Sequence, residues 1–164
     1  MCVCVALSHK DRDRVAMRLN CLLLQKAEEA GLAATFLKAD ADLRGAHAEM
    51  WVWPGALLTA KVKDARGKLR NACGYKVVSV GEEVVLEGQI VLSRRECCRD
   101  MRLACARTAA GVQGATFRDQ RLLLMDALSP FMDHRKVYVA SSRVTAGEFF
   151  HVARQDQEGL LKGI

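Results

Sequence analysis

Proline and aromatic residues are scarce in this sequence, and the common catalytic loops are missing from it. Its 164 residues include only two prolines and 5% aromatic residues. No linker rich in Ser, Pro or Gly divides it, which predicts one compact unit. The sequence holds no GxxxxGK(S/T) phosphate loop, no GxGxxG turn and no GxSxG nucleophile elbow. We therefore expect no catalysis from this chain alone.

Long hydrophobic runs are also absent. The apolar stretch at 2–7 is too short for the core of a signal peptide or for a membrane span, so we expect a protein that does not enter a membrane. The seven cysteines are odd in number and include no CxxC pair. This pattern indicates reduced thiols in an intracellular protein, cytoplasmic or nuclear.

Metal-ligand spacing is not found among the cysteines or the four histidines, and we assign no metal ligand. The adjacent Cys97 and Cys98 are interpreted as buried or incidental thiols, with a structural zinc site as the alternative. Hydrophobic residues make up 51% of the chain and charged residues 27%, which is typical of a soluble globular protein. The formal charge of +6 fits a nucleic-acid or nucleotide-phosphate partner.

Hydrophobic periodicity predicts the opening of an α/β fold. A short apolar strand at 2–7 precedes a helical pattern from Lys10 to Gly31, where Gly31 is a plausible C-cap. The helical pattern rests on apolar residues at helical spacing: Val15, Leu19, Leu22, Leu23 and Ala27. A strand followed by a long helix is how an α/β unit begins.

The middle of the chain is different, because short β-like runs alternate with turn residues there. Closely spaced strands of this kind predict a small antiparallel barrel or meander inserted in the α/β domain. After it we expect a strand, a glycine-containing loop, a second strand, a helix and a last short element. The β-like runs are 35–37, 56–62, 75–80, 84–86 and 89–92, and the later elements are Met101–Thr108, Arg121–Asp126, His134–Ser142 and Glu148–Ala153.

Two segments near the C-terminus carry a specific resemblance. TAAGVQGATF (108–117) and RKVYVASSRVT (135–145) resemble motifs V and VI of superfamily 1 helicases, T-x-x-x-x-Q-G and Y-V-A-x-S-R. The most similar branch is the RecD/Pif-like one, with a UvrD-like C-terminal helicase domain. In that branch an SH3-like insert lies just ahead of motif V, in the same order as the β-rich segment here.

Two further segments extend this resemblance over about 2–153. LRNACGYKVVSV is similar to the segment that in this branch reads N-G-x-x-G, with Asn71 and Gly74 in register and Ala72 in place of the first glycine. VALSHKDRDRVAMRLN resembles motif IV, a strand leading into a helix with Arg and Asn. The resemblance implies an α/β, RecA-like (P-loop NTPase-type) parallel-sheet domain over 2–153. Within it 54–100 would be the SH3-like β-barrel insert, and 154–164 a polar tail.

The resemblance also implies a function. The chain would be the C-terminal motor domain of an ATP-dependent DNA helicase without its phosphate-loop domain, and so would not hydrolyse ATP alone. ATP and Mg²⁺ would be bound only with a first RecA-like domain supplied elsewhere. The expected partners are that phosphate-loop helicase domain and single-stranded nucleic acid. The alternative is a non-catalytic nucleic-acid- or protein-binding module derived from a helicase.

Site residues are carried over from the nucleotide-side motifs. Arg143 corresponds to the arginine finger that meets the γ-phosphate, for which a planar, permanently charged fork is suited; the alternative is a solvated helix residue. Gln113 and Gly114 match the motif V pair and would lie near the nucleotide, unless they form an ordinary strand-to-helix loop. Arg14 is either a second phosphate contact or an exposed helix arginine.

Other residues are candidates for contact with a nucleic-acid strand. Thr108 matches the threonine of motif V, although Ala110, Gly111 and Val112 replace the polar residues, commonly H-K-S, that stand before Q-G. That departure predicts a weaker grip at this motif. The loop KVKDARGKLR is either a basic strand-binding rim or a solvated turn, and Trp51 and Trp53 either stack on bases or anchor the core. The rim residues are Lys61, Lys63, Arg66, Lys68 and Arg70.

Overall fold

The computed structural model describes residues 2–38, 49–61, 67–118, 120–125 and 129–153. It divides into two compact units: the first unit is 1–19 with 105–164, and the second unit is 20–104. Because the sequence has no linker rich in Ser, Pro or Gly, we predicted one compact unit, and that prediction is wrong. The second unit needs no linker because the chain enters it within a helix and leaves it between two strands.

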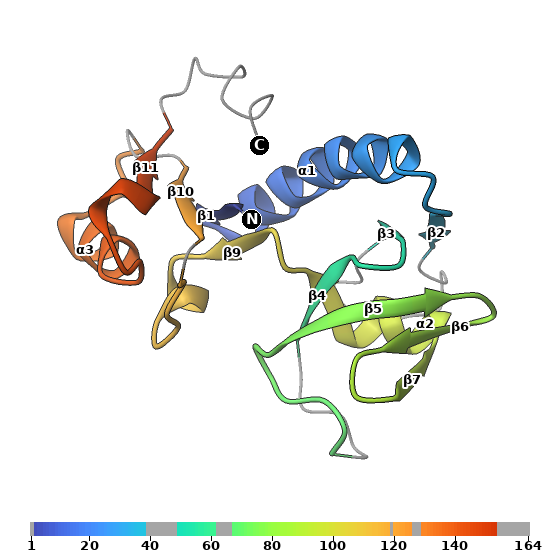
Figure 1. The fold of residues 1–164 in the computed structure, drawn as a ribbon. Helices are drawn as coiled ribbons and strands as arrows, with labels where there is room; N and C mark the ends of the chain where they lie inside the picture. The colour runs from blue at the N-terminus through green and yellow to red at the C-terminus, as the bar shows by residue number, and fades with distance from the viewer. Residues whose placement is uncertain (1, 39–48, 62–66, 119, 126–128, 154–164) are drawn as a thin grey trace. The chain divides into compact units, whose positions relative to one another are not determined.

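The first unit is built on a parallel sheet with the order β11-β10-β1-β9 (Figure 1). β1 (Cys2–Ala6) pairs in parallel with both β10 (Arg121–Leu124) and β9 (Ala106–Thr108), and β10 pairs with β11 (Phe150–Val152). Val3, Val5 and Leu122 to Leu124 are buried in these strands. Parallel strands read as continuous apolar runs because both faces of such a sheet are covered. The predicted α/β domain with a parallel sheet is confirmed.

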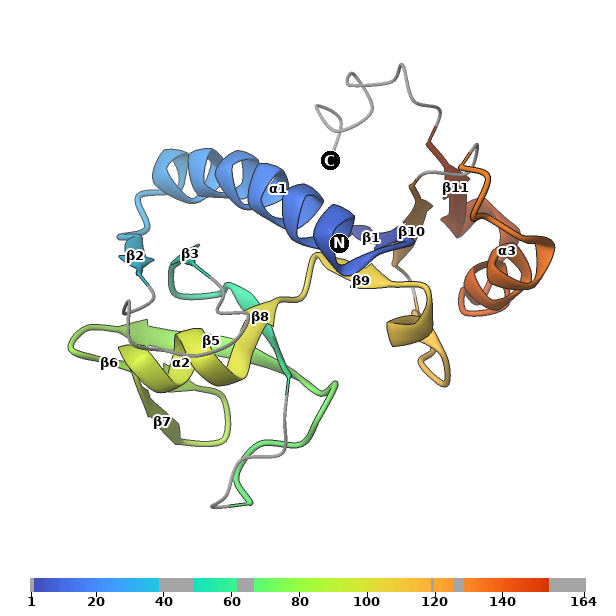
Figure 2. The ribbon, with the colours of Figure 1, turned by 180° about the vertical axis from the view of Figure 1, so that it is seen from behind.

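Helix α1 (His9–Glu29) follows β1, and its start is fixed by Ser8. The Asp11 N–H donates to Ser8 Oγ (3.1 Å), which is the bond of an N-cap. At the other end Gly31 has φ +73, and the Leu32 N–H donates to the Ala27 carbonyl (2.9 Å). This left-handed glycine ends the helix as expected. Figure 2 shows α1 leaving the end of β1 beside β9.

The described part of the first unit also contains three shorter helices. The 3₁₀ helix η1 (Ala110–Val112) follows β9, α3 (His134–Ser141) lies between β10 and β11, and the 3₁₀ helix η2 (Gly147–Phe149) precedes β11. Apolar residues of η1 and α3 join the sheet in one core that contains Val112 and Ala140, together with Phe117 from the loop after η1. Within the described part of the chain, no helix is long and apolar enough to cross a membrane.

The second unit contains an antiparallel sheet with the order β7-β6-β5-β4-β8 and a two-stranded ribbon of β2 with β3. Among the described strands this five-stranded sheet is open, so a closed SH3-like barrel stays a prediction. The short helix α2 follows β7. The bounds are β2 Thr35–Leu37, β3 Met50–Val52, β4 Leu57–Ala60, β5 Gly74–Val80, β6 Glu83–Leu86, β7 Ile90–Ser93, α2 Arg94–Asp100 and β8 Met101–Leu103.

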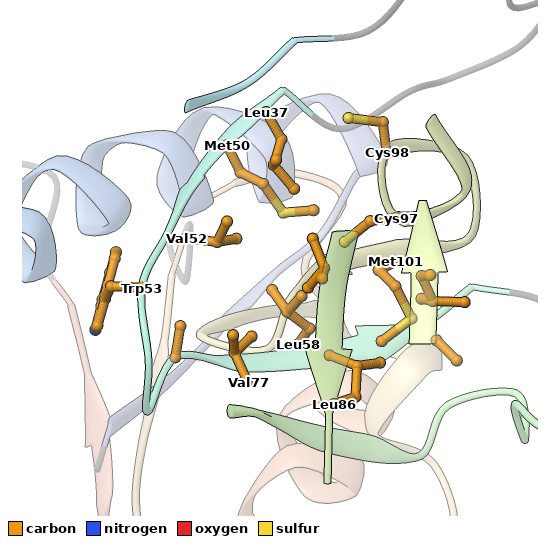
Figure 3. Packing of buried hydrophobic residues seen from close by; sticks show 14 of the residues in the cluster. Leu37, Met50, Val52, Trp53, Leu58, Val77, Leu86, Cys97, Cys98 and Met101 are labelled. Carbon is orange, nitrogen blue, oxygen red and sulfur yellow. The ribbon is translucent and has the colours of Figure 1, made fainter. Parts of the chain in front are cut away.

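Buried side chains from all these strands and from α2 form the core of the second unit (Figure 3). Leu58, Leu86, Met101 and Cys97 are fully buried there, and Trp53 is 8% exposed. Trp53 therefore belongs to the core, which is the second of the two interpretations considered for the tryptophans. Trp51 packs against the same core and lies 5.2 Å, centroid to centroid, from the Phe36 ring.

Asn20 is the polar residue that ties α1 to this core. It is fully buried, and its side-chain amide pairs with the backbone of Trp51 in β3. Asn20 Nδ2 donates to the Trp51 carbonyl (2.9 Å), and the Trp51 N–H donates to Asn20 Oδ1 (2.8 Å). The amide thus satisfies two backbone groups at the edge of a strand, as a neighbouring strand would.

The predicted strand Met101–Thr108 is wrong as a single element. β8 ends at Leu103 and pairs with β4 of the second unit, whereas β9 begins at Ala106 and pairs with β1 of the first. The break lies between units: the Ala104 N–H donates to the Leu57 carbonyl (3.1 Å), and the Cys105 carbonyl accepts from Cys4 (2.8 Å). An apolar run gives no sign of which sheet each half joins.

Helix α2 was not predicted, although its capping residues were visible in the sequence. Ser93 Oγ accepts from the Glu96 N–H (3.2 Å), and the Glu96 side chain accepts from the Ser93 N–H (2.9 Å). This is the reciprocal capping box that S-x-x-E predicts. The helix was missed because its seven residues, RRECCRD, have little apolar periodicity.

Candidate nucleotide and nucleic-acid site

Arg143 lies at the turn directly after α3, in the first unit. Its Nε and Nη2 donate to Ser142 Oγ at 3.2 and 3.0 Å. Ser142 Oγ in turn donates to the Val139 carbonyl (3.2 Å), so the hydroxyl joins the guanidinium to the last turn of the helix. Arg143 is partly exposed, as a side chain that meets a ligand would have to be. Ser142 therefore orients the arginine that the motif predicts.

The start of α3 is fixed by a capping aspartate. Asp133 Oδ1 accepts from the Lys136 N–H (2.8 Å), and Asp133 Oδ2 accepts from Lys136 Nζ (2.9 Å). These side-chain and backbone bonds from Lys136 hold the pKa of Asp133 below its ordinary value. Lys136 Nζ also donates to the Phe131 carbonyl (2.7 Å), which ties the preceding loop to the helix. The helix ahead of Arg143 thus begins at a defined residue.

Thr108 is the last residue of β9, and its hydroxyl is used within its own loop. Thr108 Oγ1 accepts from the Gly111 N–H (3.1 Å). A Cβ on Gly111 would lie 3.0 Å from that oxygen, so glycine allows a close approach here. Val112 is fully buried in the core of the first unit. The stretch that replaces the usual polar residues of motif V is therefore a compact, largely apolar turn.

Gln113 and Gly114 follow this turn, and both are exposed. Gln113 is the C-cap of η1, with its backbone N–H donating to the Ala110 carbonyl (3.2 Å). Gly114 has φ +78, a left-handed conformation that favours glycine. Both residues therefore lie at the surface of the loop, and their roles at a nucleotide stay predictions.

The structure brings the two motif-like segments together at Phe117, which the sequence did not single out. The Phe117 N–H donates to the Arg143 carbonyl (2.8 Å), and Phe117 forms a parallel β-bridge with Val144. Phe117 is 6% exposed, and the Arg107 guanidinium lies 5.5 Å from the centroid of its ring. A phenylalanine in a loop has no spacing rule, so no signal in the sequence marked it.

The arginines at the start of α1 differ in burial. Arg14 is exposed, with a 64% accessible side chain, and pairs with Asp11 at 3.4 Å. Arg12 is the buried one at 8%, with Nε and Nη2 donating to Asp13 Oδ1 at 2.8 and 2.6 Å. Arg12 Nη1 also lies 2.8 Å from His9 Nδ1. Burial distinguishes Arg12 from its neighbours, and helical spacing from Val15 could have indicated it.

The basic rim belongs to the second unit. Lys61 Nζ donates to the Cys98 carbonyl (3.0 Å) and its backbone N–H to the Asp100 carbonyl (2.7 Å), so its ammonium is bound to α2. Lys63 and Arg66 lie outside the described residues. Lys68 and Arg70 are exposed. The predicted role of this loop in strand binding stays a prediction.

The thiols of α2 are buried in the second-unit core, as Figure 3 shows for Cys97 and Cys98. Burial raises the pKa of Cys97 to about 12, so that thiol is protonated at neutral pH. Within the described residues, no group of three or more His, Cys, Asp and Glu side chains could hold a metal ion.

Comparison with known proteins finds a fold and no close sequence relative. No protein-family model matches this sequence, and no curated protein matches it. Among solved structures, the chain is similar to a complex of two coordinating Pif1 helicases at forked double-stranded DNA (TM-score 0.59, 15% identity, 92% of this chain and 38% of that one). It is also similar to Bacteroides Pif1 bound to single-stranded DNA (TM-score 0.58, 15% identity, 92% and 40%).

A Pif1 helicase from Candida albicans gives TM-score 0.50 at 11% identity, over 94% of this chain and 45% of that one. These likenesses extend over nearly the whole chain. The chain, however, spans only about two fifths of the length of the first helicases that it matches. At this level of identity the similarity concerns the fold. The described chain has the fold of one part of a Pif1 helicase.

Proposed function

We propose that this chain is the second RecA-like motor domain of a RecD/Pif-like superfamily 1 helicase, acting with a phosphate-loop domain. The observation that carries the proposal is the contact between the two motif-like segments, Phe117 N–H to Arg143 carbonyl, in a fold shared with Pif1 helicases. The segments were matched to motifs V and VI from sequence alone. Their meeting in one unit is what a shared site requires.

Arg143 would act as the arginine finger. Its guanidinium is permanently charged and planar, so it can meet two oxygens of a γ-phosphate and stabilise the charge that develops during transfer. Ser142 would keep it directed between turnovers, because the hydroxyl accepts two of its N–H groups. The phosphate loop and the ligands of Mg²⁺ would come from the other motor domain.

The nucleic-acid partner would be single-stranded DNA, as in the Bacteroides Pif1 structure bound to it. Thr108 would contribute little to strand binding through its hydroxyl, which already accepts a bond from Gly111. The exposed Lys68 and Arg70 of the second unit would supply phosphate contacts, in what we further propose is an SH3-like insert.

Mixing the chain with the first motor domain of a Pif1 helicase tests the proposal. ATP turnover should appear only in the mixture with single-stranded DNA, and Arg143→Ala should lower kcat by about 10³-fold or more, as loss of an arginine finger does. Arg121→Ala, at an exposed position of β10 outside both motif-like segments, is the control and should leave kcat unchanged.

Two results would contradict the proposal. One is Mg-ATP turnover by the purified chain alone that vanishes on Arg143→Ala. The other is a mixture in which turnover is present but does not depend on Arg143. A salt titration of binding to single-stranded DNA tests the nucleic-acid part separately, since phosphate contacts give a steep decrease of affinity with salt.

A further inference from the structure

Phe117 contacts both the turn that carries Arg143 and the core of the first unit. Its backbone donates to the Arg143 carbonyl at 2.8 Å, and it forms a β-bridge with Val144. Phe117 is 6% exposed and belongs to the core cluster that also contains Ala140 of α3. The turn that presents Arg143 is therefore attached to the rest of the unit through Phe117, in addition to its own helix.

Arg107 contacts the ring of Phe117. It precedes Thr108 in β9, where it is paired in register with Val5 of the central strand β1. Its guanidinium lies 5.5 Å from the Phe117 ring centroid. A guanidinium within about 6 Å of an aromatic ring is attracted by the negative face of that ring. The strand that ends in the motif V-like threonine thus holds Phe117 by its ring.

We propose that Phe117 is a positioning residue for Arg143, and that Arg107 keeps it in place from β9. This inference rests on the proposed function, since Arg143 is the residue that is positioned. It assigns the connection between the two motif-like segments to Phe117 and Arg107 rather than to the exposed Gln113. A displacement of β9 at Thr108 would reach the Arg143 turn through one ring and one backbone hydrogen bond.

Amide hydrogen exchange in the full chain alone tests the connection without any catalysis. Loss of the ring contact in Arg107→Gln should make exchange of the Phe117 amide about three- to ten-fold faster relative to the buried Leu123 amide, given the usual strength of such contacts. Arg107→Lys keeps a cation and should restore most of the protection. Arg118→Gln, at the exposed residue next to Phe117, is the matched control and should change nothing.

Turnover in the mixture with a phosphate-loop motor domain tests the positioning role. Phe117→Leu keeps an apolar side chain but removes the ring, and it should lower kcat about ten-fold or more while leaving KM for ATP nearly unchanged. This split is expected because an arginine finger acts mainly in the transition state. A structural defect alone would instead lower the fraction of active protein, which active-site titration of the mixture reports.

The outcomes separate the two proposals. If Arg107→Gln leaves the relative exchange of the Phe117 amide unchanged, the connection through the ring is refuted. If exchange responds but kcat of Phe117→Leu is that of the wild type, the positioning role is refuted. A wild-type mixture without turnover overturns the motor-domain proposal and the positioning role with it, while exchange still decides whether Arg107 holds Phe117.

Discussion

Replacing Asn20 by alanine should destabilise the second unit through two specific hydrogen bonds. The buried amide donates to the Trp51 carbonyl (2.9 Å) and accepts from the Trp51 N–H (2.8 Å). Alanine leaves both backbone groups without that partner in a half-buried strand. A buried group left unsatisfied costs about 1–3 kcal/mol, so we expect a loss of about 2–4 kcal/mol in the free energy of unfolding.

Tryptophan fluorescence is a selective assay for this loss. The chain has two tryptophans, Trp51 and Trp53, and both lie in the second unit. With a urea m-value of about 2 kcal/mol/M, which is ordinary for a small protein, the midpoint should fall by about 1–2 M. Gln25→Ala, at an exposed position on the same helix, is the control and should change the free energy by less than about 0.5 kcal/mol.

An aspartate at the same position separates the two bonds. Asn20→Asp keeps an acceptor for the Trp51 N–H but sets a carboxylate against the Trp51 carbonyl, in a site that is fully buried. The burial and the facing carbonyl oxygen would both raise the pKa of that carboxyl in the folded protein. The destabilisation should therefore be complete above the raised pKa and recover as the pH falls toward about 4, where the acid can donate. An Asn20→Ala midpoint equal to the wild type would refute the reasoning.

Three further predictions concern single residues. Ala72 has φ +62 at the third position of a turn, so Ala72→Gly should stabilise the fold by about 0.5–1 kcal/mol, whereas Ala33→Gly should not; urea unfolding checks both. Thr59 is fully buried and its Oγ1 lacks a hydrogen-bond partner among the described residues, so Thr59→Val should stabilise by about 1 kcal/mol in the same assay. Burial raises the pKa of Cys97 and Cys105 from 9.0 to about 12, so these thiols lose their protons at a lower pH in the unfolded chain than in the folded protein. The free energy of unfolding should therefore decrease as the pH rises above 9. The decrease should be less steep in a variant with alanine at both positions.

Local patterns in the sequence were sufficient for many individual elements. β2 has the predicted bounds Thr35–Leu37, and α1 begins and ends within two residues of expectation. The bounds of α1 follow from short-range physics: the spacing of apolar residues, a capping Ser8 and a left-handed Gly31. Ala72 belongs here too, because the resemblance expected glycine at this position and the backbone has a glycine-like φ of +62. The residue at this position therefore differs from the motif, whereas the turn keeps the conformation that glycine would adopt.

Pairings over long sequence distances could not be predicted. The partner of Asn20 is 31 residues away, and nothing at Trp51 marks a strand edge that needs an amide. The apolar run around Ala104 is continuous, while its halves join different sheets. Likewise, the hydrogen bond from Phe117 to Arg143 forms only in the folded unit, where the turn after α3 lies beside the loop that leads into β10. Such contacts are set by the topology, which local periodicity does not encode.

The departure at Ala110–Val112 is the point where sequence and structure together limit the mechanism. The usual polar residues there would present donors to a nucleic-acid strand, but in this chain Val112 is fully buried and Thr108 Oγ1 accepts from Gly111. The turn is therefore stabilised from within and offers a strand fewer side-chain contacts. Under the motor-domain proposal, a response to DNA would be transmitted by the backbone position of β9 rather than by side chains at this loop. Arg107, which belongs to β9 and reaches the Phe117 ring, is placed to transmit it.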